Sequence, residues 1–293
     1  MGRLSSVVTM TDNPTVALLG TGTMGAGMAR NLAKAGLPLR VWNRSDEKAQ
    51  ELSDLAEVSG SVQEAVDGAD IVITMLYDAD SVVDTMEQAR GHLGADTIWV
   101  QQSTVGVEGS DRVVAFAKDL GVTLVDAPVL GTRKPAEDGA LVVLASGPDD
   151  AQATLTPVFE AIGGRTMWVG EAGAGSRLKL AANAWVATVL EGIADSLALT
   201  RDLGLDPALF LEAVSGGAMD APYVQLKGKA MLSDSYDPAF ALSGVLKDVD
   251  LILAAAEGAG TDLGPMPGIR AHLARAVDAG HGDLDMAATY LAH

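Results

Sequence analysis

The glycine-rich turn Gly20-Thr21-Gly22-Thr23-Met24-Gly25 is the part of the sequence whose residue types and spacing point most directly to chemistry. It follows the short apolar run Val16–Leu19 and precedes a helical pattern. In such a unit the first glycine permits a tight turn, the second lets backbone approach a pyrophosphate, and the third lets helix and strand pack closely. The helix N-terminus also offers unpaired N–H groups to the anion. These six residues are therefore predicted to bind a dinucleotide.

The second predicted strand, 39–42, ends in Asn43-Arg44-Ser45. An NAD-dependent enzyme usually presents Asp or Glu at this position, to the ribose 2′-hydroxyl, and that acid is missing here. Arg44 can pair with a 2′-phosphate, with Asn43 and Ser45 adding hydrogen bonds. The cofactor is therefore predicted to be NADP(H).

Two further pairs of residues end predicted strands at the edge where open α/β sheets bind ligands. Met75 and Leu76 end the strand 71–76 and are expected to pack on the cofactor. Ser103 and Thr104 follow the strand 97–100.

The elements that must position these residues alternate between strand and helix patterns. This alternation predicts an open, mostly parallel sheet covered on both faces. Strands are expected at 16–19, 39–42, 71–76, 97–100 and 123–126, with 141–145 and 167–169 completing the sheet, and helices at 24–35, 46–55, 62–66 and 109–120.

After the glycine-rich run 170–175 no strand pattern follows, and apolar residues recur at helical spacing. A single long helix is expected from Ser176 to Leu203, ended by Gly204, with Pro207 opening the next. The predicted fold class is α/β, with a Rossmann-type doubly wound domain joined through this long helix to an all-helical domain. The expected boundaries are a flexible extension at 1–13, the NADP domain at 14–174 and a substrate and dimerisation domain at 175–293.

Composition excludes several classes of partner and site. The formal charge of -19 repels nucleic acid and anionic membranes alike, and no apolar run approaches the roughly 20 residues of a spanning helix. The chain has no cysteine, which excludes disulfides and thiolate sites and favours a cytoplasmic location. No metal is expected, because the four histidines show no metal-ligand spacing: His92, His272, His281 and His293.

Four motifs, in order, resemble the β-hydroxyacid dehydrogenase family, which includes 3-hydroxyisobutyrate dehydrogenases and glyoxylate/succinic semialdehyde reductases. The resemblance runs from Val16 to Leu291. The motifs are Leu19–Gly25 continuing into Met28–Leu32, Asp126-Ala127-Pro128-Val129-Leu130-Gly131-Thr132, Gly173–Asn183, and Phe240–Leu246 followed by Lys247-Asp248.

The resemblance implies an oxidoreductase that interconverts a small β-hydroxy acid and its aldehyde or keto acid. Hydride transfer to a carbonyl requires one proton, and Lys179 is expected to donate or accept it. Asn183, one helical turn later on the same face, is expected to orient the lysine or the substrate. The resemblance also places Thr104 near the nicotinamide ribose, Ser103 near the substrate and Lys247 on the cofactor. From the residues alone, Lys247 and Asp248 could equally be a surface ion pair.

The substrate is a short carboxylic acid by the same resemblance, and the segment Leu130-Gly131-Thr132 is expected to bind its carboxylate. The run 134–139 is especially similar to glyoxylate/succinic semialdehyde reductases. Leu130, however, stands where the family usually has serine, so one polar contact to the carboxylate is lost. Backbone N–H groups of Gly131 and Thr132 could still bind the anion.

Two alternatives remain open at this point. An imine reductase-like enzyme would share the architecture and the NADP(H) turn, although such enzymes typically carry another residue in place of Lys179. A non-catalytic dinucleotide-binding protein would keep the cofactor site without the chemistry. The long apolar helices of the second domain further predict a homodimer.

Overall fold

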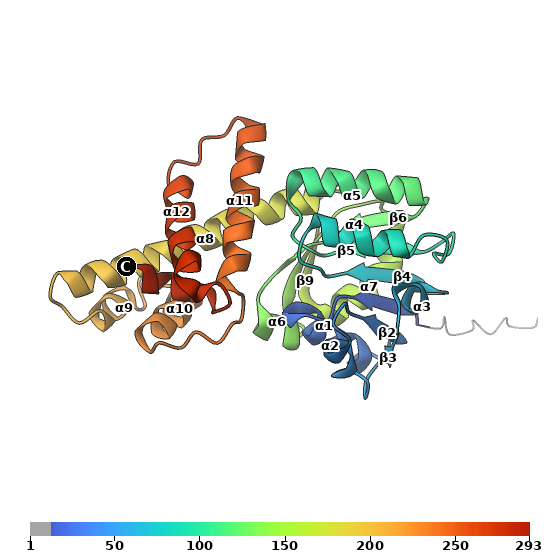
Figure 1. The fold of residues 1–293 in the computed structure, drawn as a ribbon, viewed down its shortest axis with the longest axis horizontal. Coiled ribbons are helices and arrows are strands. Elements are labelled where there is room, and N and C mark those ends of the chain that lie inside the picture. The colour runs from blue at the N-terminus through green and yellow to red at the C-terminus, as the bar shows by residue number, and fades with distance from the viewer. Residues whose placement is uncertain (1–12) are drawn as a thin grey trace, which may run out of the picture.

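The computed structural model describes residues 13–293 of the chain. The predicted N-terminal extension, residues 1–13, therefore lies outside the described residues except for Asn13. An α/β domain and a helical domain lie side by side, and one long helix runs from the first through the second (Figure 1). This arrangement confirms the predicted fold class.

Six parallel strands form the main sheet in the order β3-β2-β1-β4-β5-β6. The central strands are buried on both faces, which is why they read as continuous apolar runs. The strand order reverses between β1 and β4, and the carboxyl ends of strands at such a point open a crevice for ligands. The strands are β1 (Val16–Leu19), β2 (Leu39–Trp42), β3 (Glu57–Val58), β4 (Ile71–Thr74), β5 (Ile98–Gln101) and β6 (Thr123–Asp126).

Helices cover both faces of this sheet because its side chains alternate between two hydrophobic clusters. Val16 and Leu18 pack with α1 and α7 on one face, whereas Ala17 and Leu19 pack with α3, α4 and α5 on the other. The helices of this domain are α1 (Thr23–Lys34), α2 (Asp46–Gln50), α3 (Val62–Val66), α4 (Ala79–Gln88), α5 (Gly106–Leu120), α6 (Arg133–Glu137) and α7 (Ala151–Ile162).

The last strands of the domain do not complete the main sheet, so that prediction was wrong. β7 (Val129–Leu130), β8 (Leu141–Ala145) and β9 (Gly163–Trp168) form a separate three-stranded sheet. The chain leaves the main sheet at Pro128, which has no N–H to donate to a strand ladder. The Pro128 carbonyl instead accepts from Leu144 N–H at 2.9 Å, within the second sheet.

Other differences from the sequence expectations are local. The helix expected at 46–55 ends at Gln50 and continues as turns, and the strand expected to reach Leu76 ends at Thr74. The sequence pattern did not predict α4, α6, α7, β3 or β7.

The helical domain contains no strand among the described residues after β9, as predicted. The long helix α8 spans Ala174–Asp202 and passes through the whole domain (Figure 1). The other helices are α9 (Ala208–Val214), α10 (Pro222–Leu232), α11 (Leu242–Ala259), α12 (Met266–Ala276), η1 (Val277–His281) and η2 (Met286–Ala292). Within residues 13–293, no helix is both long and apolar enough to cross a membrane.

Candidate active site

The glycine turn between β1 and α1 shows a different constraint at each glycine. Gly20 has φ of +109°, and a Cβ there would lie 2.2 Å from the Met75 carbonyl oxygen. A Cβ on Gly25 would lie 1.9 Å from the carbonyl oxygen of Gly20. A Cβ on Gly22 would meet no atom within 4 Å. Two glycines are therefore required for the turn to form, whereas Gly22 keeps the space in front of the turn clear.

This turn fits the diphosphate of a dinucleotide. Gly22 caps α1 without a side-chain hydrogen bond, and no acidic residue occupies the first helical turn. The first N–H groups of α1 are thus available to an anion. The Thr21 hydroxyl is buried, and no hydrogen-bond partner for it lies within the described part of the chain. Both features match a phosphate ligand.

The residues after β2 divide into one that supports the turn and one that faces solvent. Asn43 Oδ1 accepts from Thr21 N–H at 3.1 Å, and Asn43 Nδ2 donates to the Ser45 carbonyl at 3.0 Å. Asn43 thus lies beside the glycine turn and stabilises its conformation. Arg44 is exposed, and no hydrogen bond or ion pair engages its guanidinium among residues 13–293. Arg44 is therefore free to pair with a phosphate.

The ends of β4 and β5 lie against the turn. Ser103 is buried, and its hydroxyl accepts from Leu76 N–H at 2.8 Å. Gln101 holds Ser103 from the other side, since its Oε1 accepts from Ser103 N–H at 2.6 Å. Ser103 therefore supports the loop that carries Met75 and Leu76, which favours a positioning role over the predicted substrate contact. Thr104, Met75 and Leu76 are half-buried at the edge of the crevice.

Lys179 is buried on the second turn of α8. Its Nζ donates to the Val129 carbonyl at 2.7 Å, so the ammonium lies beside the segment that continues to Leu130. Burial lowers the pKa of Lys179 from its ordinary 10.5 to about 8, the Asp248 carboxylate opposes this change, and the Lys247 charge adds to it. A pKa near 8 lets one side chain both donate and accept a proton close to neutral pH.

Asn183, Asp248 and Lys247 form a hydrogen-bonded group next to Lys179. Asn183 Nδ2 donates to Asp248 Oδ2 at 2.7 Å, and the Lys247 ammonium lies 2.9 Å from Asp248 Oδ1. Lys247 also donates to the Thr104 carbonyl at 2.9 Å and lies 5.4 Å from the ring centre of Tyr77. Helix α11 thereby contacts the loop after β5. It also brings the Lys247 ammonium close to that of Lys179, so two cations lie together in a strongly acidic chain.

Lys247 and Asp248 do form an ion pair, but the expectation that it lies at the surface is wrong, because Asp248 is only 3% exposed. Sequence reasoning missed its role in the site. The available signal was its spacing on α11: Val245, three residues earlier, and Ile252, four residues later, are both buried, and this places Asp248 on the inner face.

Asp126 is a second residue whose role the sequence did not reveal. Its buried carboxylate accepts from Ser176 N–H at 2.8 Å and from the Ser176 hydroxyl at 2.7 Å. Burial raises the pKa of Asp126 despite these hydrogen bonds. Because β6 is in this way joined to the first turn of α8, Asp126 determines where Lys179 lies relative to the sheet.

The predicted carboxylate-binding segment begins at the end of β7, one residue after the Val129 carbonyl that Lys179 contacts. Gly131 has φ of +133° and is exposed, and Thr132 caps α6 without using its hydroxyl. The Leu130 side chain is half-buried. The segment therefore presents backbone groups and one apolar side chain near Lys179.

Two of the four histidines, which show no metal-ligand spacing in the sequence, lie together in the structure. The rings of His272 and His293 lie with their centres 4.1 Å apart, in the helical domain. Residues that are distant in sequence are brought together by the fold there, so sequence spacing could not reveal this pair.

Comparison with known proteins identifies two family models on this chain. Residues 15–170 match the NAD binding domain of 6-phosphogluconate dehydrogenase. Residues 173–292 match the domain described as NAD-binding of NADP-dependent 3-hydroxyisobutyrate dehydrogenase.

Curated relatives and solved structures agree with these models. Glyoxylate/succinic semialdehyde reductase 2 of Arabidopsis thaliana is 35% identical over 83% of this chain and 69% of its own length. A 3-hydroxyisobutyrate dehydrogenase of Pseudomonas aeruginosa is 32% identical over 94% of this chain and 96% of its own. The structure of Mycobacterium tuberculosis 3-hydroxyisobutyrate dehydrogenase with L-serine superposes with a TM-score of 0.85 at 28% identity, covering 95% of this chain and 98% of that one.

An imine reductase from Myxococcus stipitatus in complex with NADP+ has a TM-score of 0.66 at 23% identity, over 94% of this chain and 98% of that one. At this identity the likeness extends to the fold alone.

Proposed function

The chain belongs to the β-hydroxyacid dehydrogenase family of nicotinamide-dependent oxidoreductases, and on this premise we propose that it interconverts a small β-hydroxy acid and its aldehyde or keto acid with NADP(H). Lys179 is the proton donor and acceptor. The observation that carries the proposal is a buried lysine with a pKa of about 8 beside the predicted carboxylate segment.

The residues of the chain divide the chemistry between them. A bound nicotinamide supplies or accepts the hydride. In reduction, Lys179 donates a proton from Nζ to the substrate oxygen and becomes neutral, and in oxidation the neutral amine takes the hydroxyl proton. Its bond to the Val129 carbonyl orients the ammonium. Asn183, held by Asp248, has a second amide N–H that can orient the substrate.

The preference for NADP(H) is assigned to Arg44, because its guanidinium is exposed at the end of β2 and no acid occupies the ribose position. Arg44→Ala is expected to reduce the ratio of kcat/KM for NADPH over NADH by at least about tenfold, the loss of one charge-assisted contact. Arg30→Ala, which removes an exposed arginine of α1, is the matched control. Equal use of both cofactors by the unmodified protein would contradict the assignment.

The substrate class is assigned to short aldehyde acids through the segment 130–132. The test is NADPH consumption across glyoxylate, succinic semialdehyde, methylmalonate semialdehyde and tartronate semialdehyde. Leu130→Ser restores the hydroxyl usual in the family and is expected to raise kcat/KM for the accepted acid. No turnover of any of these acids would count against this substrate class.

A second candidate is imine reduction, which the half-buried Leu130 favours because it makes the substrate segment less polar. Cyclic imines in the same panel separate the two candidates. Turnover of an imine together with inactivity on every aldehyde acid would replace the first proposal. A chain that binds NADPH and turns over neither class would be a binding protein.

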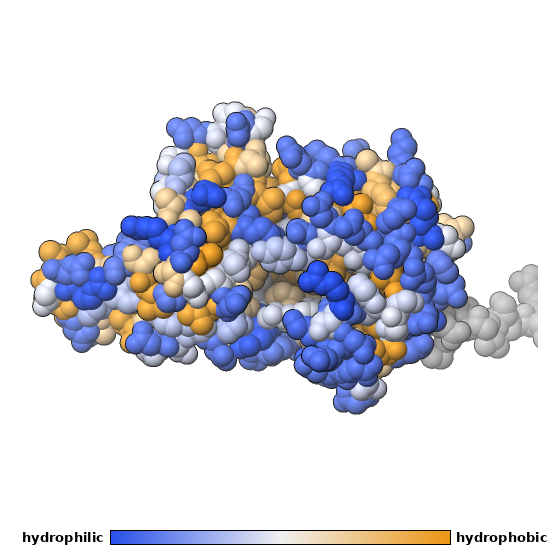
Figure 2. Space-filling view, in the orientation of Figure 1, coloured by the Kyte–Doolittle hydropathy of each residue, from blue (hydrophilic) through white to orange (hydrophobic). Residues whose placement is uncertain are grey.

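The proposed assembly is a cytoplasmic homodimer, with residues 14–174 as the cofactor domain and 175–293 as the substrate and dimerisation domain. Hydrophobic residues gather at the far end of the helical domain, over α8 and α9 (Figure 2). Leu199, Leu203 and Leu205 are 60%, 69% and 56% exposed there. Burying them against a second copy removes apolar surface from water. Sedimentation of a fully active monomer would refute the dimer.

A further inference from the structure

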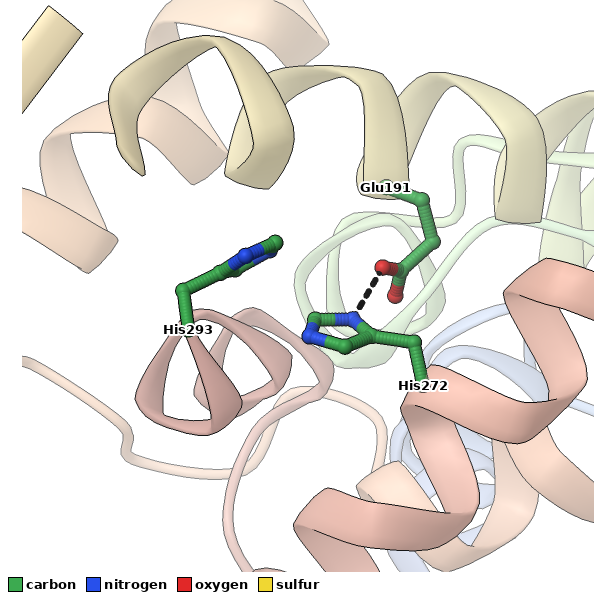
Figure 3. Close-up of side chains that lie close together, drawn as sticks. All are labelled: Glu191, His272 and His293. Atoms are coloured by element: carbon green, nitrogen blue, oxygen red, sulfur yellow. Dashed lines mark hydrogen bonds and ion pairs between the residues drawn. The ribbon is translucent and has the colours of Figure 1, made fainter. Parts of the chain in front are cut away.

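A polar cluster of two buried residues and one exposed residue lies in the helical domain, built from three elements. Glu191 is on α8, His272 is on α12, and His293 follows η2. One ligand atom from each, a carboxylate oxygen or a ring nitrogen, lies within 4.8 Å of the other two. Figure 3 shows the three side chains pointing toward one another.

Glu191 is held firmly in this cluster. His272 Nδ1 donates to Glu191 Oε2 at 2.6 Å, and the Thr289 hydroxyl donates to Oε1 at 2.6 Å. Glu191 and His272 are 4% and 7% exposed, and Thr289 is fully buried. A buried carboxylate is costly without such partners, so its place in the core is fixed by a small set of contacts.

His272 has more hydrogen-bonding capacity than its neighbours satisfy. Its Nε2 is buried, and no partner for it is found among residues 13–293. The His293 ring lies over the His272 ring, and its Nε2 is 3.5 Å from Asp195 Oδ1. Two imidazoles and one carboxylate thus place their ligand atoms within 4.8 Å of one another, and Asp195 lies beside His293 at the surface end of the cluster.

We propose that Glu191, His272 and His293 bind a divalent transition-metal ion, with Zn²⁺ as the representative. Imidazole and carboxylate are suitable ligands for Zn²⁺, and three protein ligands with an open fourth position are a common arrangement. Asp195 lies one helical turn after Glu191 and can take the fourth position. The two carboxylates balance the charge of the ion, and the nearby Arg201 is already paired with Asp202 at 2.8 Å.

The geometry requires only a small adjustment. A tetrahedral ion with bonds of about 2.1 Å holds its ligand atoms about 3.4 Å apart, so no pair has to close by more than roughly 1.4 Å. His272 Nδ1 and Glu191 Oε2, now 2.6 Å apart, have to open by about 0.8 Å, and Nδ1 releases its proton to solvent when it binds the ion. The His293 side chain, 17% exposed at the edge of the cluster, can rotate to do so. The bound ion would join α8, α12 and the segment after η2, and would therefore stabilise the helical domain.

Zinc titration by calorimetry tests the site, using tag-free protein freed of metal with a chelator. Millimolar Mg²⁺ in the buffer occupies exposed acidic groups, because Mg²⁺ prefers oxygen ligands. The unmodified chain is expected to bind one Zn²⁺, and His293→Ala is expected to weaken binding at least about tenfold. Glu191→Gln is expected to weaken binding in the same way. His92→Ala, which removes an exposed histidine distant in sequence from the cluster, is expected to leave binding unchanged.

Thermal unfolding provides a second measurement that does not depend on enzyme activity. Zn²⁺ is expected to raise the Tm of the unmodified chain and of His92→Ala, and to leave the Tm of His293→Ala unchanged. Because His293 lies at the edge of the cluster, its removal leaves the bond between Glu191 and His272 intact. The proposal is overturned if the unmodified chain binds no Zn²⁺, or if His293→Ala binds it as tightly as the unmodified chain.

Discussion

Replacement of Lys179 by methionine should abolish turnover and, at neutral pH, make the protein more stable. The ammonium is buried in the folded protein, which lowers its pKa to about 8 from 10.5. The unfolded chain therefore keeps the proton up to about pH 10.5, whereas the folded protein releases it near pH 8. Between these values the unfolded state binds more protons, so stability rises with pH.

The magnitude follows from this difference in pKa. At about 1.36 kcal/mol for each pKa unit, the buried charge costs about 3 kcal/mol at pH 7. Methionine removes that cost but also the hydrogen bond to the Val129 carbonyl, which is worth about 1 kcal/mol. The expected net gain is about 2 kcal/mol at pH 7. At pH 9.5 the folded protein carries neutral lysine while the unfolded chain is still protonated, so the remaining cost is one pKa unit, about 1.4 kcal/mol, and the net gain falls below about 0.5 kcal/mol.

Urea unfolding at pH 7 and pH 9.5 measures both gains, and NADPH consumption measures turnover. Lys118→Met, which replaces an exposed lysine of α5, is the control and should change stability by less than about 0.5 kcal/mol at either pH. Turnover by Lys179→Met would refute the catalytic role. A stability change that is equal at both pH values would refute the burial argument.

The contacts in the site also determine how variants of Gly22, Gly25, Asp248 and Asp126 should behave. Gly22→Ala should fold normally and weaken NADPH binding, since its Cβ enters the open space in front of the turn. Gly25→Ala should instead lower the Tm, because its Cβ meets a backbone oxygen at 1.9 Å. Equal Tm values for the two variants would contradict this. Asp248→Asn removes a negative charge that raises the pKa of Lys179. The basic limb of the pH profile of aldehyde reduction should therefore move to lower pH. An unmoved limb would show that Asp248 does not act on the pKa of Lys179. Asp126→Asn should cost about 1–3 kcal/mol in urea unfolding, because a buried acceptor at the start of α8 is lost, and an unchanged midpoint would show that this anchor is dispensable.

The pattern of the sequence predicted the elements whose signals are local. The turn from Gly20 to Gly25 was predictable because its steric constraints are local. They act within the unit of β1, turn and α1 and against the end of the neighbouring strand β4. The long helix α8 was predictable from its apolar spacing and from Gly204 at its end. The short elements α6 and β7 were not, because five-residue and two-residue segments carry too little periodicity to be distinguished from loops.

The separate second sheet could not be read from its strands. β8 is apolar, β9 carries apolar residues only at its end, Met167 and Trp168, and both have ordinary strand length, which is equally compatible with either sheet. Their partner is decided by where the chain leaves β6 at Pro128 and by the bridge between Asp126 and Ser146. Such pairing is a property of the packed chain and not of any one segment.

The sequence by itself determined the family, the class of cofactor and the residue types that can do the chemistry, because those signals are carried by short motifs. The tertiary structure decided their environment. Lys179 meets Val129 from 50 residues away, Asn183 meets Asp248 from 65 and Glu191 meets His272 from 81. Burial and neighbouring charge set the pKa of a side chain and its capacity to bind a metal. Both depend on segments that only the folded chain brings together, so the lowered pKa of Lys179 and the histidine cluster became visible only in the structure.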